Sequence, residues 1–366
     1  MQSLKSFPFS RVLITGGAGF IGGCLVRRLL RESNSVIFNL DKLGYASDTS
    51  GIDQCLLNIQ DDNPKRYHLV HVDLCDKNSL DHAIELADPD LVIHLAAESH
   101  VDRSIDSPKA FLDSNVFGTF NLLEAVRCHW QQLPLARKLC FRFHHVSTDE
   151  VFGSLGKSGS FNEKTSYDPR SPYSATKAAS DHLVRAWHHT YNLPIVITNC
   201  SNNFGPWQFP EKLIPLVILK ALHLESIPLY GDGLNVRDWL YVEDHVEALI
   251  LVACKGVIGS SYCIGGYGER TNREVVNKIC SVMDHRMPSN IHHSSFITAV
   301  KDRPGHDKRY SIDSSLISSE LGWTPKYSFD DALTLTIDWY INNVEWCKKV
   351  SAKGDYAGAR IGLNEL

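Results

Sequence analysis

Short apolar runs alternate with longer amphipathic segments through roughly the first 200 residues. In segments such as FIGGCLVRRLLRE and AFLDSNVFGTFNLLEAVRCHW, apolar side chains recur at helical spacing. The apolar runs predicted as strands are 11–15, 35–40, 67–72, 91–96, 140–147 and 195–200. This alternation is typical of βαβ units, which build a parallel sheet covered by helices on both faces. We therefore predict an α/β fold with a doubly wound parallel sheet.

The regular rhythm ends after residue 200, where the turn-rich segment SNNFGPWQFP begins. Later segments are shorter and mixed, with Gly and Pro between them. We predict a first domain of residues 1–200 plus about 239–265, and a smaller mixed α/β domain of about 201–238 plus 266–350. Residues 351–366 are predicted as a C-terminal tail.

Composition excludes several classes of protein. The net charge of -5 argues against nucleic-acid binding, which needs a basic surface. No apolar run approaches the roughly 20 residues of a membrane span, and no signal-peptide core precedes the first strand. The ten cysteines are scattered without a CxxC pair, and the seventeen histidines lack HExxH spacing. We expect a cytoplasmic protein with reduced thiols and no bound metal.

A glycine-rich turn, TGGAGFIGG, directly follows the first predicted strand. Gly16, Gly19 and Gly22 permit a tight turn and close backbone approach, so a pyrophosphate can lie on the amides that open the next helix. Asp41 ends the second strand, where a carboxylate accepts the ribose hydroxyls of a dinucleotide. Its charge favours NAD over NADP, although Lys42 beside it weakens that preference. The pattern predicts a Rossmann-type NAD site.

Asp73 follows the third predicted strand and is open to two interpretations. It could accept a hydrogen bond from the adenine amino group, or it could cap the next helix together with Asp76. The sequence does not decide between them.

Tyr173 and Lys177 form a YxxxK motif, and this i,i+4 spacing places both side chains on one helix face. A free tyrosine has a pKa of about 10, so a basic role near neutral pH needs help. A fixed ammonium nearby favours the phenolate, and we expect Lys177 to lower the pKa of Tyr173 in this way. Pro172 predicts a helix start that places Tyr173 in the first turn.

Asp149 and Glu150 stand side by side at the end of the fifth predicted strand. Adjacent carboxylates there are costly unless they are solvated, paired or used in chemistry. A solvated turn is the plain alternative to a catalytic role.

Several blocks along the chain resemble extended short-chain dehydrogenases/reductases, and more closely the dTDP-glucose 4,6-dehydratase family. The resemblance runs from about residue 10 to about residue 345, and the tail DYAGARIGL is also similar. The blocks that carry it are TGGAGFIG, HLAAESHVDRSI, STDEVFG, YSATK, CSNNFGPWQFPEKLIP, RDWLYVEDH and DRPGHDKRYSID.

The resemblance implies a role for each acid. Tyr173 would take the proton of the sugar 4-hydroxyl, with Thr148 bound to the same oxygen, while hydride leaves carbon 4 for NAD. Glu150 would then remove the proton on carbon 5 and Asp149 would protonate the departing hydroxyl on carbon 6. Crowded like charges raise one carboxyl's pKa, which keeps that group protonated. Because strand neighbours face opposite sides, we predict a loop beginning near Thr148.

The resemblance also implies binding residues. For the cofactor they are Gly16, Gly19, Phe20, Ile21, Gly22, Asp41, Lys42, Asp73, Leu74, Ala96, Ala97, Ser99, Tyr173, Lys177 and Asn203. For dTDP-glucose they are Ser99, Thr148, Asn202, Lys212, Leu213, Tyr230, Arg237, Asn272, Arg303 and His306. Surface salt bridges are the alternative for any one of the cations among them.

Two departures from the family pattern concern Phe152, where a Tyr is common, and GGYGERTN, which differs from the usual GGxNE. The second change bears on nucleoside recognition. Alternatives are a UDP-glucose 4,6-dehydratase, a 4-epimerase, a decarboxylase, or a non-catalytic NAD-binding scaffold. Apolar faces of residues 110–126 and of the Tyr173 helix predict a homodimer, as relatives form, unless these faces are simply core.

Overall fold

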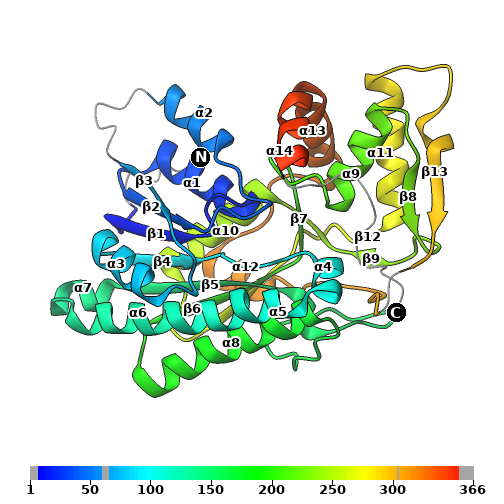
Figure 1. Ribbon diagram of the computed structural model, residues 1–366. Helices are drawn as coiled ribbons and strands as arrows, with labels where there is room; N and C mark the ends of the chain where they lie inside the picture. The colour runs from blue at the N-terminus through cyan, green and yellow to red at the C-terminus, as the bar shows by residue number, and fades with distance from the viewer. Residues whose placement is uncertain (1–6, 60–65, 303–304, 354–366) are drawn as a thin grey trace.

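The computed structural model describes residues 7–59, 66–302 and 305–353. Its centre is a seven-stranded sheet in the order β11-β6-β5-β4-β1-β2-β3, with every neighbouring pair parallel (Figure 1). The strands are β1 Arg11–Thr15, β2 Val36–Asp41, β3 Tyr67–His71, β4 Leu91–His94, β5 Arg142–Thr148, β6 Ile195–Cys200 and β11 Ser261–Ile264. The predicted doubly wound sheet is confirmed, and it has one strand, β11, beyond the six predicted.

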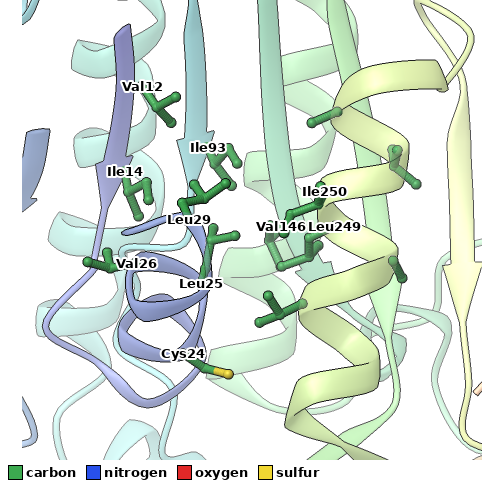
Figure 2. Close-up of a cluster of buried hydrophobic side chains, with 14 of the residues drawn as sticks. Val12, Ile14, Cys24, Leu25, Val26, Leu29, Ile93, Val146, Leu249 and Ile250 are labelled. Atoms are coloured by element: carbon green, nitrogen blue, oxygen red, sulfur yellow. The ribbon is translucent and has the colours of Figure 1, made fainter. Parts of the chain in front are cut away.

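Helices cover both faces of the sheet because successive strand side chains point to opposite sides. Val12 and Ile14 of β1 face one layer of helices, whereas Leu13 faces the other. The first layer contains α1 Phe20–Glu32, α2 Ser50–Asn58, α10 Val242–Lys255 and α12 Ser315–Leu321. The second contains α3 Lys77–Ala87, α6 Gly118–Gln132 and α8 Pro172–Tyr191. Figure 2 shows Leu25 and Leu29 of α1 meeting Ile93 and Val146 of the sheet.

Short segments fill the connections of this half of the molecule. They are α4 Val101–Asp106, α5 Pro108–Phe111, a π-helical turn Leu112–Phe117, α7 Leu135–Cys140 and a 3-10 turn Asp149–Phe152. The predicted helix over 110–130 is thus interrupted by the π-helical turn. The predicted strand over 140–147 begins two residues later, because α7 extends to Cys140.

A second lobe lies beside the carboxyl ends of the strands, on the right of Figure 1. Its helices pack on one another around a separate apolar core. They are α9 Leu213–Leu222, α11 Asn272–Arg286, α13 Phe329–Asn342 and α14 Val344–Lys353, with a 3-10 turn at His293–Phe296. The strands here are β7 Asn202–Phe204, β8 Ile227–Tyr230, β9 Val236–Arg237, β10 Trp239–Tyr241, β12 Arg270–Thr271 and β13 Ile297–Val300. They form three two-stranded sheets, β10–β7, β12–β9 and β13–β8.

The chain order reverses between β1 and β4, and crevices at such reversals bind ligands in doubly wound folds. The predicted tail begins inside α14, and the rest of it, 354–366, lies outside the described residues. All ten cysteines are free thiols, as predicted. Within the described ranges, no helix combines the length and apolar character that crossing a bilayer requires.

Candidate active site

The glycine turn connects β1 to α1 and leaves the first amides of the helix open. Gly16 has a φ of 73°, and its N–H donates to Leu40 O at 2.9 Å. Gly19 caps α1 and has no side-chain oxygen to offer to the amides of the first turn. A Cβ on Gly22 would lie 2.2 Å from Gly16 O, and one on Gly16 would lie 2.7 Å from Ala96. The turn therefore requires glycine, and its amides fit a pyrophosphate.

A cavity of about 330 Å³ runs from this turn along the carboxyl ends of the strands. Every residue predicted above for the cofactor lines it, as do all five predicted catalytic residues. A single cavity thus brings together side chains from β2, β5, α8 and the loop after β6.

Asp41 is buried, and its carboxylate ties the glycine turn to the loop after β2. Oδ2 accepts from Ala18 N at 3.0 Å, while Oδ1 accepts from Leu43 N at 2.8 Å and Ser47 Oγ at 2.9 Å. The neighbouring Lys42 forms an ion pair with Glu98 at 2.6 Å. Glu98 therefore offsets the positive charge of Lys42, and the preference of Asp41 for NAD over NADP no longer has this cation against it.

The two interpretations of Asp73 are separated by the geometry of α3. Asp76 caps this helix alone, because its carboxylate accepts from Ser79 N at 3.3 Å. Asp73 instead accepts from Cys75 N at 2.9 Å and lines the cavity. The helix-cap interpretation is wrong for Asp73, and the adenine interpretation stays a prediction.

The acid pair lies just beyond the end of β5. The strand ends at Thr148, one residue beyond the predicted end, and Asp149–Phe152 forms a 3-10 turn in place of the loop expected near Thr148. Thr148 Oγ1 accepts from Glu150 N at 3.3 Å and donates to Asp149 Oδ1 at 3.3 Å. This turn changes the direction of the backbone, so Asp149 and Glu150 both line the same cavity.

Asp149 is 1% exposed, whereas Glu150 is half-buried. Burial raises the pKa of Asp149 well above its usual range, and the negative charges of Glu150 and Asp238 raise it further. Its Oδ2 has no hydrogen-bond partner among the described residues. A buried carboxyl with these neighbours keeps its proton, which is the state that an acid catalyst needs.

Tyr173 and Lys177 lie on the first turns of α8, which begins at Pro172 as predicted. Ser171 and Ser174 form a capping box that fixes this helix start. Lys177 Nζ donates to Val146 O at 2.9 Å, and both Tyr173 and Lys177 are buried.

The expected pKa shift of Tyr173 is wrong in direction. Burial raises the pKa of the phenol well above 10, and the charge of Glu150 raises it further. Burial also lowers the pKa of Lys177, against the opposing charge of Asp181. The expectation failed because it counted the ammonium but not the loss of water around both groups.

The family model described as GDP-mannose 4,6 dehydratase matches residues 13–336. A dTDP-glucose 4,6-dehydratase from Neisseria meningitidis serogroup B is 49% identical over 360 residues, 97% of this chain and 99% of the relative. The chain belongs to the dTDP-glucose 4,6-dehydratase family.

Solved structures of this family and of related enzymes have the same fold. A dTDP-glucose 4,6-dehydratase from Streptomyces venezuelae with NAD and TYD bound is 40% identical, with a TM-score of 0.83 over 93% of this chain and 99% of that one. A Thermus thermophilus UDP-glucose 4-epimerase in complex with NAD is 28% identical, with a TM-score of 0.78 over 91% and 99%.

The residues predicted for the nucleotide sugar fall into two groups. Ser99, Thr148, Asn202 and Lys212 line the main cavity, and Lys212 Nζ donates to Ser99 O at 3.0 Å. Leu213 does not line it; this residue opens α9 and packs against the core of the second lobe.

The second group lies in the second lobe, outside the lining of that cavity. Tyr230 OH donates to Asp102 Oδ2 at 3.2 Å, and its ring lies 6.3 Å from His306. Arg237 lies 4.3 Å over the Tyr310 ring, and the β9–β12 pairing brings it near Asn272. Arg303 lies outside the described residues. The segment after Gly305 contacts both this group and the chain just beyond the acid pair, since Asp307 O accepts from Arg237 Nη2 at 3.0 Å and Lys308 N donates to Ser154 Oγ at 2.9 Å.

The sequence analysis missed Glu211, which lines the cavity, and Tyr310, a buried phenol close enough to Glu150 for that charge to raise its pKa. Glu211 lines the cavity and accepts from Tyr45 OH at 2.8 Å and from Arg103 Nε at 3.1 Å. Tyr310 is 1% exposed, and its OH donates to Asp307 Oδ2 at 2.5 Å. Both stand in blocks that carried the family resemblance, PEKL and DKRYSID, and this was the available signal.

Proposed function

We propose that the protein is an NAD-dependent dTDP-glucose 4,6-dehydratase, a hydro-lyase that forms dTDP-4-keto-6-deoxyglucose. The observation that carries the proposal is Asp149, a buried carboxyl with a raised pKa that shares one cavity with Glu150 and Tyr173. Elimination of water across two neighbouring carbons needs a proton donor and a proton acceptor side by side. Near relatives with this name support the choice of substrate.

Each site residue has one task in the proposed reaction. Tyr173 takes the proton of the 4-hydroxyl, and Thr148 binds the same oxygen. The 4-ketone acidifies the proton on carbon 5, which Glu150 removes. Asp149 protonates the hydroxyl that leaves carbon 6. When bound, NAD would supply the hydride acceptor at carbon 4 and the hydride donor to carbon 6. Glu150 returns its proton to carbon 5 as the hydride arrives at carbon 6, so no net oxidation results.

The glycine turn, Asp41 and Asp73 would hold NAD, since the open amides and the glycine-only contacts fit a dinucleotide. We infer that residues 1–200 plus about 239–265 form the NAD-binding domain and that about 201–238 plus 266–350 bind the nucleotide sugar. The pairing of β11 with β6 supports this division. The free thiols support a cytoplasmic location.

The proposed function is tested by incubating purified protein with dTDP-glucose and, in parallel, with UDP-glucose. We expect a 4-keto-6-deoxy product from dTDP-glucose, detected by mass spectrometry, and a kcat/KM at least about tenfold lower for UDP-glucose. A preference for UDP-glucose would identify the protein as a UDP-glucose 4,6-dehydratase. A 4-epimer or a decarboxylated product would assign the corresponding rival enzyme. A protein that binds NAD but forms no product would be the non-catalytic NAD-binding scaffold.

We also propose a homodimer through the outer faces of α6 and α8. Phe117 and Phe120 are 59% and 42% exposed, and the Phe120 ring meets Trp187 of α8 at 5.8 Å. Phe117→Glu is expected to convert a dimer into a monomer in sedimentation velocity, because a charge replaces apolar contact area. Leu135→Glu on α7, also at an exposed apolar residue, is the matched control and leaves the dimer intact. A monomeric wild-type protein would contradict the proposal.

A further inference from the structure

Asp181 is a carboxylate buried behind the wall of the active site. It lies on α8, one turn after Lys177, and its exposed fraction is 0%. It does not line the cavity, so it contacts neither substrate nor cofactor there. The reaction steps above give it no task.

Four side chains from three segments donate hydrogen bonds to this carboxylate. They are His145 Nε2 to Oδ1 at 3.0 Å, and Tyr167 OH at 2.8 Å, Ser147 Oγ at 2.9 Å and Asn199 Nδ2 at 3.3 Å to Oδ2. Three of these donors are electrically neutral groups, and burial lowers the pKa of the fourth, His145, against the opposing charge of Asp181. A carboxylate surrounded by donors is stabilised as the anion, and the pKa of Asp181 is accordingly lowered.

A buried anion costs several kcal/mol unless a cation lies close to it. Two cations on α8 flank Asp181, with Lys177 one turn before it and Arg185 one turn after it. Arg185 Nη2 donates to Tyr167 OH at 3.4 Å and is half-buried, so water screens part of its charge. Lys177 is buried, so water screens its charge from Asp181 less than it screens the charge of Arg185.

Lys177 is in turn a buried cation, which a nearby negative charge would stabilise. Its Nζ donates to Val146 O at 2.9 Å, a neutral acceptor, while burial favours loss of its proton. The titratable groups facing it are Asp181 and Tyr173 on its own helix, His145 on β5, His94 on β4 and Cys200 on β6. Burial lowers the pKa of both histidine rings, and it raises the pKa of the Cys200 thiol to about 12. Asp181 is thus the anion among them.

We propose that Asp181 is a positioning residue that acts as the buried counter-charge of Lys177 and keeps that side chain an ammonium beside Tyr173. The inference rests on the proposed function, in which Tyr173 and Lys177 act as a unit. Asp181 acts through Lys177 and not on the substrate. Its four donors fix the anion in place, so that the charge on α8 persists at the pH of catalysis.

The test compares Asp181→Asn, which keeps the shape of the side chain and removes the charge, with wild type. Without the anion the pKa of Lys177 falls, so the alkaline limb of the single-turnover rate of oxidation at carbon 4 is expected to move to lower pH by about one unit, a tenfold change in equilibrium. KM for dTDP-glucose stays within about twofold. Ser180→Ala is the matched control, because Ser180 is a buried neutral hydrogen-bonding residue on the same helix. In Ser180→Ala the alkaline limb is expected at the same pH as in wild type.

A second readout follows Lys177 without turnover. In protein labelled with ¹³C at lysine Cε, the Lys177 resonance, assigned by its loss in Lys177→Met, is expected to titrate about one unit lower in Asp181→Asn. A folded Asp181→Asn whose pH profile and resonance both coincide with wild type overturns the inference. An inactive wild type overturns the proposed function instead.

A further variant serves if Asp181→Asn does not fold. Ser147→Ala/Tyr167→Phe removes two donors and keeps the carboxylate. With fewer donors the carboxylate is less firmly held as the anion, so the Lys177 resonance is expected to titrate about half a unit lower than in wild type. A folded double variant whose Lys177 resonance coincides with that of wild type overturns the inference.

Discussion

Asp149→Asn is expected to lower the rate of product formation by about 10²- to 10⁴-fold, the range seen when a general acid is removed. Asparagine keeps the size of the side chain but cannot give a proton to the hydroxyl leaving carbon 6. Oxidation at carbon 4 depends on Tyr173 and continues. Reduced cofactor should therefore accumulate on the enzyme, which stopped-flow near-ultraviolet absorbance detects in a single turnover.

The same substitution is expected to stabilise the fold near neutral pH. The raised pKa means that folded Asp149 holds a proton which the unfolded chain releases above its ordinary pKa of 3.8. The stability therefore falls as the pH rises from about 4 through the folded pKa, and an amide avoids this loss. Thermal unfolding at about pH 8 should show a higher Tm for Asp149→Asn than for wild type.

Asp168→Asn is the matched control for both measurements. Asp168 is an exposed carboxylate paired with Arg170 at 2.8 Å, so its loss should change neither rate nor Tm appreciably. If Asp149→Asn slows oxidation and elimination equally, the division of roles between Asp149 and Tyr173 is wrong.

The sheet could be predicted from sequence because its first six strands are short β-rich runs that alternate with amphipathic helical segments. β11 was missed since SYCI is only four residues long and follows a helix rather than another run. Its partner β6 ends about 60 residues earlier in the chain, and pairing at that separation depends on how α10 packs across the sheet. The π-helical turn was missed because its apolar spacing continues that of α6.

The cofactor side of the site was easier to predict than the nucleoside side. The glycine turn and Asp41 follow strand ends, and the carboxyl edge of a parallel sheet brings strand ends together. Tyr230, Arg237 and Asn272 instead stand on short strands and a helix of the second lobe, whose packing no local pattern specifies. The direction of the pKa shift of Tyr173 could not be predicted, because the burial that causes it depends on the whole fold.

Tyr173→Phe is expected to lower kcat by about 10²- to 10⁴-fold and to abolish oxidation at carbon 4, so that no reduced cofactor forms. Phenylalanine keeps the ring and its edge contact with Phe111 at 6.3 Å, so NAD binding and Tm should remain close to wild type. Single-turnover absorbance and NAD titration measure the two effects separately. The contrast with Asp149→Asn, which oxidises but does not eliminate, is the main signature of the proposed reaction.

The raised pKa of Tyr173 also fixes the sign of the pH dependence. The phenol must lose its proton to act as a base, so the oxidation rate of wild type should rise with pH until Lys177 in turn loses its proton. Asp149 must keep its proton, so the elimination rate should fall with pH, and kcat should pass through a maximum. Tyr191→Phe, at the far end of α8 and 40% exposed, is the matched control and retains this maximum. An oxidation rate that is independent of pH would mean that another group takes the proton.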